Sequence, residues 1–140
     1  MIEPGSPPSR ASQSRPQTRV FQSLTISAVR ALVSRRAAAA GMDVGRAHDL
    51  VLAVCEVATN SVRHANGSGV LRIWQEGDGL VCEVADRGRP ARPLAGRDRP
   101  MPGQEGGYGL WIAGQLCDRI QLLQRDTGTV IRMHMAVKAG

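Results

Sequence analysis

The clearest hydrophobic pattern in the chain lies between Arg46 and Ala65. At 100° per residue its apolar positions share one stripe of a helix, about 120° wide. The stripe consists of Ala47, Leu50, Val51, Val54, Ala58, Val62 and Ala65. Glu56 and Asn60 lie on the opposite side, one turn apart, so a carboxylate and a carboxamide sit side by side. Taken alone, this pair is interpreted as a solvated polar face.

The same helical spacing predicts two further helices. One spans about Ser27 to Ala40, and Gly41 is a suitable residue to follow its end. Its shared face consists of Val29, Leu32, Val33, Ala37 and Ala40. The other begins near Gly109 or Leu110, and its shared face consists of Leu110, Ala113, Gly114 and Cys117.

Alternation of polar and apolar residues predicts an edge strand at 20–25 and four strands at 70–75, 80–85, 119–125 and 129–137. Turn residues at 76–79 and 126–128 join the last four strands into two hairpins. The predicted inward side chains are Leu71, Ile73, Leu80, Cys82, Val84, Thr129, Ile131, Met133, Met135 and Val137. Asp86 continues the period of Val84, so an acidic side chain points inward where a strand ends.

The predicted order is therefore β-α-α-β-β-loop-α-β-β. Strands joined by short turns pair mostly antiparallel, so we predict an α+β fold. It would be a two-layer α/β sandwich whose mixed, mostly antiparallel sheet has helices on one face. Residues 1–18, rich in Pro, Ser, Gln and Arg, predict a disordered tail before a single domain at 19–140. The aperiodic segment at about 87–106, rich in Pro, Arg and Gly, predicts a lid loop.

Composition narrows the class of protein. With one Phe, one Tyr and two Trp in 140 residues, the core must be aliphatic. The formal charge of +6 permits a nucleic-acid partner, but the arginines are scattered between the tail and the loop and form no basic helix face. A ligand or partner rich in phosphate or carboxylate fits equally well.

Three widely spaced cysteines form neither a zinc pattern nor a disulfide framework, which favours a reducing, cytoplasmic setting. We expect no secretory signal and no membrane-spanning segment.

Three further features accompany the Glu56/Asn60 pair. Asp86-Arg87-Gly88 places an inward carboxylate before a residue without a side chain, although a loop cap has the same composition. Gly106-Gly107-Tyr108-Gly109-Leu110 lies at a predicted helix start, where glycines let the backbone approach a phosphate; a flexible hinge is the alternative. Gly128-Thr129 puts a hydroxyl on the inward face of the last strand, a position that β-branched residues also occupy for packing alone.

In order, the chain reads E-x-x-x-N, D-x-G, G-x-G-L and G-T. This order resembles the GHKL (Bergerat) ATP-binding fold over about residues 20–137. Residues 56–65 are similar to the corresponding pattern of anti-sigma-factor serine/threonine kinases. Where that family commonly reads D-x-G-x-G, Pro90 replaces the second glycine, which removes a backbone donor and stiffens the chain.

The resemblance implies a role for each matching residue. Asn60 would coordinate Mg²⁺, and Glu56 would act as general base, provided that Arg63 does not pair with it. Asp86 would accept a hydrogen bond from the adenine amino group, and Gly88 would leave room for the ring. His64 also matches the pattern, and we interpret it as a histidine satisfied at a helix end.

The remaining implied roles concern the phosphates and the far side of the adenine. Backbone N–H groups would reach the phosphates from Gly107, Gly109 and Leu110. Thr129 would assist at the adenine through a water molecule. Arg97 and Arg99 in the lid are candidates for contact with the γ-phosphate.

The function implied by the resemblance is that of an ATP-binding anti-sigma regulatory factor. It would be a homodimeric serine/threonine-protein kinase that phosphorylates a small anti-sigma-factor antagonist and sequesters a sigma factor. One alternative is a non-catalytic nucleotide-sensing switch that binds ATP and a regulatory protein. Another is a basic nucleic-acid-binding module, whose DNA affinity would depend steeply on salt.

Overall fold

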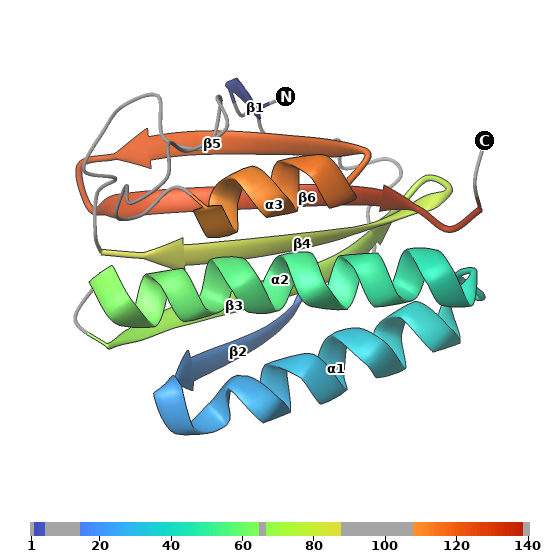
Figure 1. Ribbon diagram of the computed structural model, residues 1–140, viewed down its shortest axis with the longest axis horizontal. Helices are drawn as coiled ribbons and strands as arrows, with labels where there is room; N and C mark the ends of the chain where they lie inside the picture. Colours follow the sequence, from blue (N-terminus) through green and yellow to red (C-terminus); the bar gives the residue numbers. More distant parts are fainter. Residues whose placement is uncertain (1, 5–14, 65–66, 88–107, 139–140) are drawn as a thin grey trace.

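The computed structural model describes residues 2–4, 15–64, 67–87 and 108–138 (Figure 1). These residues form six strands: β1 (Ile2–Pro4), β2 (Gln17–Gln22), β3 (Ser68–Glu76), β4 (Gly79–Asp86), β5 (Arg119–Arg125) and β6 (Gly128–Ala136). Three α-helices accompany them: α1 (Ile26–Ala39), α2 (Val44–His64) and α3 (Tyr108–Leu116). From β2 onward this order confirms the predicted one.

The strands form one sheet in the order β1-β5-β6-β4-β3-β2. Short β1 pairs parallel with β5, and every other neighbouring pair is antiparallel. The three helices lie on one face of this sheet (Figure 1). The prediction of an α+β two-layer sandwich with a mixed, mostly antiparallel sheet is therefore confirmed.

The N-terminal part of the chain differs from the prediction. Strand β2 lies at the predicted edge, but it begins at Gln17 and ends at Gln22, and Ser23–Thr25 form a short 3₁₀ helix, η2. Thr25 accounts for the end of the strand at Gln22. Its Oγ1 atom accepts a hydrogen bond from the Gln22 N–H at 2.7 Å and donates one to the Gln22 carbonyl oxygen at 3.1 Å. Two parts of the predicted 1–18 tail are thus strand residues, at 2–4 and 17–18. Backbone pairing at the sheet edges holds them, with β5 in one case and β3 in the other.

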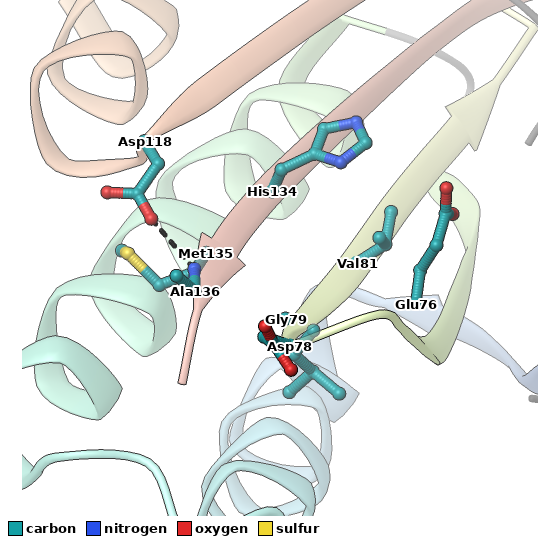
Figure 2. A pocket seen from close by; sticks show the side chains of 9 residues that line it. Glu76, Asp78, Gly79, Val81, Asp118, His134, Met135 and Ala136 are labelled. Carbon is teal, nitrogen blue, oxygen red and sulfur yellow. Dashed lines mark hydrogen bonds between the residues drawn. The ribbon is translucent and has the colours of Figure 1, made fainter. Parts of the chain in front are cut away.

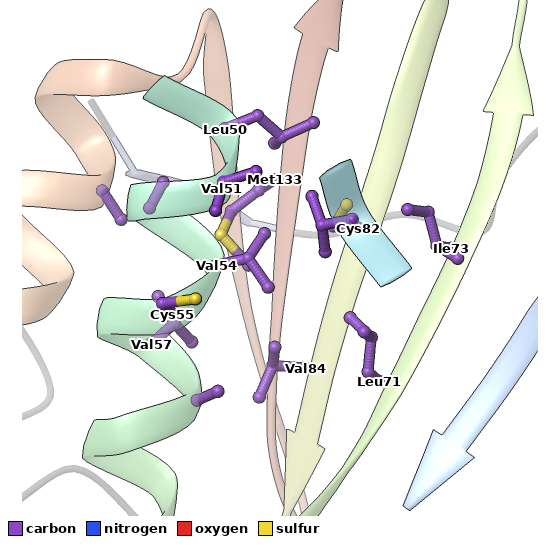
Figure 3. Close-up of a cluster of buried hydrophobic side chains, with 14 of the residues drawn as sticks. Leu50, Val51, Val54, Cys55, Val57, Leu71, Ile73, Cys82, Val84 and Met133 are labelled. Carbon is purple, nitrogen blue, oxygen red and sulfur yellow. The ribbon is translucent and has the colours of Figure 1, made fainter. Parts of the chain in front are cut away.

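The main core lies between the helices and the inner face of the sheet (Figure 3). Every predicted inward side chain is buried except Val137, which is half-buried. Helix α2 buries more than its predicted stripe, including Ala53, Cys55 and Val57. Its buried surface is wider because α2 packs against α1 on one side and α3 on the other, as well as on the sheet.

All three cysteines are free and buried in this core. Burial raises the pKa of each thiol, that of Cys117 to about 12. A thiol that stays protonated at neutral pH is a poor nucleophile and a poor metal ligand. The cysteines therefore contribute packing rather than chemistry.

The outer face of the sheet carries a buried polar layer that single-strand periodicity did not predict. Glu83 and Arg132 stand directly opposite each other on β4 and β6 and form an ion pair of 3.0 Å. The Arg132 guanidinium also lies 6.0 Å from the centre of the Trp74 ring, within the range of a cation–π contact. The layer links the two central strands, β4 and β6.

A second ion pair joins the start of α2 to the residue before β5, and hydrogen bonds join both of its members to the end of β6. Arg46 pairs with Asp118, and its Nε donates to the Ala136 carbonyl at 2.8 Å. Asp118 also accepts from the Ala136 N–H at 2.7 Å. Three segments that are distant in sequence are fastened at this end of the sandwich.

This arrangement predicts a pH-dependent contribution to stability. Partial burial acts to raise the pKa of Asp118, but the bonds from Arg46 and Ala136 and the Arg46 charge together lower it. Because the folded pKa lies below the unfolded one, the stabilisation is present above pH about 4 and is lost as the pH falls further. Asp118 is partly exposed, so Asp118→Asn should lower the free energy of unfolding at pH 7 by about 1 kcal/mol or less.

Urea unfolding of wild type and Asp118→Asn at pH 7 and pH 3 measures this contribution. The difference between the two proteins should shrink at pH 3. Asp126→Asn, which changes an exposed turn residue, is the control. A difference that is the same at both pH values would contradict the assignment.

Candidate functional site

One end of the sandwich collects most of the predicted functional residues (Figure 1). Strand β4 ends there at Asp86, and β6 begins there at Gly128. The C-terminal half of α2, with Glu56 and Asn60, runs toward the same end, where α3 also begins. Antiparallel pairing of β4 with β6 produces this meeting, because the last residue of one strand lies beside the first residues of the other.

Asp86 and Thr129 face each other across β4 and β6. They continue the row of opposed inner-face residues that includes Val84 and Ile131, which are buried. The predicted inward direction of Asp86 is thus confirmed, and its side chain is half-buried. Thr129 is buried beside it, with 7% of its surface exposed. A carboxylate and a hydroxyl therefore occupy opposite positions on neighbouring strands at this end of the inner face.

Gly128 holds this part of the chain in place, a role that sequence reasoning missed. Its φ is +144°, and a Cβ built on it would lie 1.9 Å from the Asp86 carbonyl oxygen and 2.6 Å from the Arg87 Cα. No other residue fits this approach. The available signal was a glycine at the first position of a strand, a place where another backbone often comes close.

Glu56 and Asn60 are both half-buried, so the pair is not a fully solvated face. Glu56 lies next to the first turn of α3: a Cβ on Gly109 would be 3.5 Å from its Oε2 atom. Within the described ranges, no ion pair joins Glu56 to the exposed Arg63. The carboxylate is thus not neutralised by the competitor that the sequence suggested.

The other predicted residues divide into two groups. Leu110 is buried in the first turn of α3, and His64 is the last residue of α2. Outside the described residues lie Gly88, Pro90, Arg97, Arg99 and Gly107.

In the part of the chain that is described, no three His, Cys, Asp or Glu side chains are grouped so that they could hold a metal ion by themselves. None of the described helices has the length and apolar character to cross a membrane.

A cavity of about 310 Å³ lies at the opposite end of the sandwich (Figure 2). Its lining includes the β3–β4 hairpin residues Glu76 and Asp78, together with His134 and Asp118. The Asp118 carboxylate in its wall is already bonded to Ala136 and Arg46. None of the predicted site residues lines this cavity.

The family model for the histidine kinase-like ATPase domain matches residues 22–135. This chain belongs to that family. The predicted GHKL resemblance is therefore confirmed, and membership of a family of ATPase domains implies that the chain binds ATP. The matched range contains every residue placed above at the site end of the sandwich.

Solved structures support the same fold for this ATPase domain. A structure of the RsbU and RsbW domains of Rv1364c from Mycobacterium tuberculosis superposes with a TM-score of 0.66 at 21% identity. The match covers 91% of this chain and 34% of that one, so this domain spans about a third of the longer protein. The Acinetobacter baumannii histidine kinase AdeS matches with a TM-score of 0.53 at 10% identity, over 90% of this chain and 70% of its own. No curated protein matches the chain.

Proposed function

We propose that this ATPase domain is an anti-sigma regulatory factor with serine/threonine-protein kinase activity. It binds Mg·ATP, phosphorylates a small anti-sigma-factor antagonist protein and sequesters a sigma factor. The observation that carries the proposal is the meeting of Glu56, Asp86 and the start of α3 at one end of the sandwich. The kinase-like spacing of residues 56–65 and the similarity to a structure that contains an RsbW domain give further support.

Asp86 recognises the adenine in this proposal. A carboxylate accepts hydrogen bonds but cannot donate them when ionised, so it suits the exocyclic amino group of adenine. Its place at the end of β4, fixed by Gly128, keeps the acceptor in one position. Thr129 stands opposite and assists through a water molecule, and Gly88 leaves room for the ring.

The phosphates bind at the start of α3. Exposed N–H groups at a helix N-terminus and the positive end of the helix dipole both favour anions. The donors are the backbone groups of Gly107, Gly109 and Leu110. Gly109 has no side chain to cover them, and the Leu110 side chain points away into the core.

Asn60 is the proposed Mg²⁺ ligand. Mg²⁺ is commonly held by one or two protein oxygens together with phosphate oxygens and water, so a single half-buried carboxamide fits this binding mode. When bound, the ion offsets the charge of the phosphates. A cage of several protein carboxylates is not required, which agrees with the described residues around Asn60.

Glu56 is the proposed general base. It accepts the proton of the attacking serine hydroxyl while the serine oxygen forms a bond to the γ-phosphorus. The bond from the γ-phosphorus to the bridging oxygen breaks, and ADP leaves with that oxygen. Because Glu56 is half-buried and unpaired with Arg63, its carboxylate is available for this proton.

The proposed partners are a sigma factor and its antagonist, and the protein acts as a homodimer in the cytoplasm. Three free, buried thiols suit a reducing compartment. The antagonist supplies the serine hydroxyl. Its phosphorylation state then decides which of the two partners the kinase retains.

Calorimetric titration with ATP and Mg²⁺ tests the binding step. Asp86→Asn should weaken ATP binding about tenfold to 100-fold, because a charged hydrogen bond at a half-buried position is lost. Asp78→Asn, which removes the same charge from an exposed turn at the other end of β4, should leave the affinity unchanged. Equal affinities of wild type and Asp86→Asn would refute the proposed adenine contact, and no ATP binding by the wild type would refute the proposal as a whole.

A further inference from the structure

Helix α3 lies close against α2 at Gly109. A Cβ built on this residue would lie 3.3 Å from the Glu56 carbonyl oxygen and 3.5 Å from its carboxylate oxygen Oε2. The first of these distances is shorter than most real Cβ contacts, so α2 and α3 would have to separate by a few tenths of an ångström. The missing side chain thus allows the first turn of α3 to lie directly on Glu56.

We infer that Gly109 is a positioning residue for Glu56, an inference that rests on the proposed kinase function. Its role is to leave space beside the carboxylate, in addition to any contact of its backbone N–H with phosphate. The two roles are separable, because Gly109→Ala keeps the N–H and removes only the space. Unlike Gly128, Gly109 has no positive φ, so alanine fits its backbone conformation without strain.

Gly114 of the same helix provides a matched comparison. A Cβ at Gly114 would meet only the Ile120 Cγ2 atom at 3.7 Å, an ordinary van der Waals distance. Alanine at either position brings a similar gain in helix propensity. Only the substitution at position 109 changes the surroundings of Glu56.

Steady-state kinetics of phosphoryl transfer tests the inference. Gly109→Ala should lower kcat about tenfold or more, because a misplacement of tenths of an ångström at the base is costly, while the KM for ATP changes little. Gly114→Ala should keep both constants near the wild-type values. Equal kcat values for Gly109→Ala and wild type would overturn the inference.

A double-mutant cycle with Glu56→Asp separates positioning from a general structural effect. The shorter side chain withdraws the carboxylate from Gly109, so Glu56→Asp lowers kcat by itself. Adding Gly109→Ala to this variant should then cause less than about a threefold further loss. A full second loss, as large as the loss in the wild-type background, would mean that Gly109 does not act through Glu56.

NMR of the nucleotide-free protein tests the contact without any activity. The wild type should show nuclear Overhauser effects between the Gly109 α-protons and the Glu56 γ-protons. The Glu56 side-chain carboxyl ¹³C resonance should shift in Gly109→Ala and not in Gly114→Ala. Absence of the Overhauser effects would overturn the inference even if Gly109→Ala does not fold. A wild type that shows them but transfers no phosphate would support the contact and refute the proposed function instead.

Discussion

Gly128→Ala is expected to abolish ATP binding and to lower the free energy of unfolding by about 3 kcal/mol or more. The cause is steric, because the added methyl group would lie 1.9 Å from the Asp86 carbonyl oxygen at a backbone with φ of +144°. The start of β6 must then move away from the end of β4. This separation also displaces Asp86 at the end of β4, so the proposed adenine acceptor loses its position.

Urea unfolding and calorimetry of Gly128→Ala measure the two effects. Gly77→Ala is the matched control: Gly77 also has a positive φ, +57°, but a Cβ there would meet no atom within 4 Å. Alanine at that position should cost about 1–2 kcal/mol, through backbone strain alone, and should leave ATP binding intact. Equal destabilisation by the two substitutions would show that the contact with Asp86 is unimportant.

Glu56→Gln is expected to lower phosphoryl transfer to the antagonist at least about 100-fold, while the ATP affinity changes less than about threefold. Glutamine keeps the size of the side chain beside Gly109 but cannot take the serine proton. Incubation with labelled ATP, Mg²⁺ and the cognate antagonist measures the transfer, and calorimetry measures the affinity.

Asp49→Asn, an exposed acidic position on the same helix, is the control and should transfer phosphate at the wild-type rate. Transfer by Glu56→Gln at that rate would assign the base to another residue. A wild type that binds ATP and its protein partner but transfers no phosphate to a verified antagonist would instead be a nucleotide-sensing switch.

Much of the fold could be predicted because periodicity reports directly on burial. The alternation along β3, β4 and β6 identified the inner face correctly, and it gave the direction of Asp86 from the position of Val84. The pairing of Glu83 with Arg132 could not be predicted in this way, because it depends on the register between two strands. Strand β1 was missed for a similar reason, since it is held by backbone pairing with β5.

The candidate site was predicted in its residue types but not in its contacts. The spacing of Glu56 and Asn60 placed both on one side of α2, and the glycines marked places where the backbone comes close. The partners of those glycines are distant in sequence: Gly109 meets Glu56, and Gly128 meets Asp86. Only the packing of α3 on α2 and of β6 on β4 brings them together. The functional roles of all these residues, and those of Gly88, Gly107 and the lid arginines, stay predictions.

The two parts of the candidate site, the end of the β4–β6 pair and the helix pair α2 and α3, differ in how freely they can change during evolution. Asp86 and Thr129 are placed by strand register, which cannot slip by one residue without turning every side chain to the other face. Glu56 and Gly109 are placed by side-chain packing between two helices, which can adjust by tenths of an ångström. Under the proposed function, small core substitutions can therefore tune the rate of phosphoryl transfer over a wide range while preference for adenine is inherited unchanged.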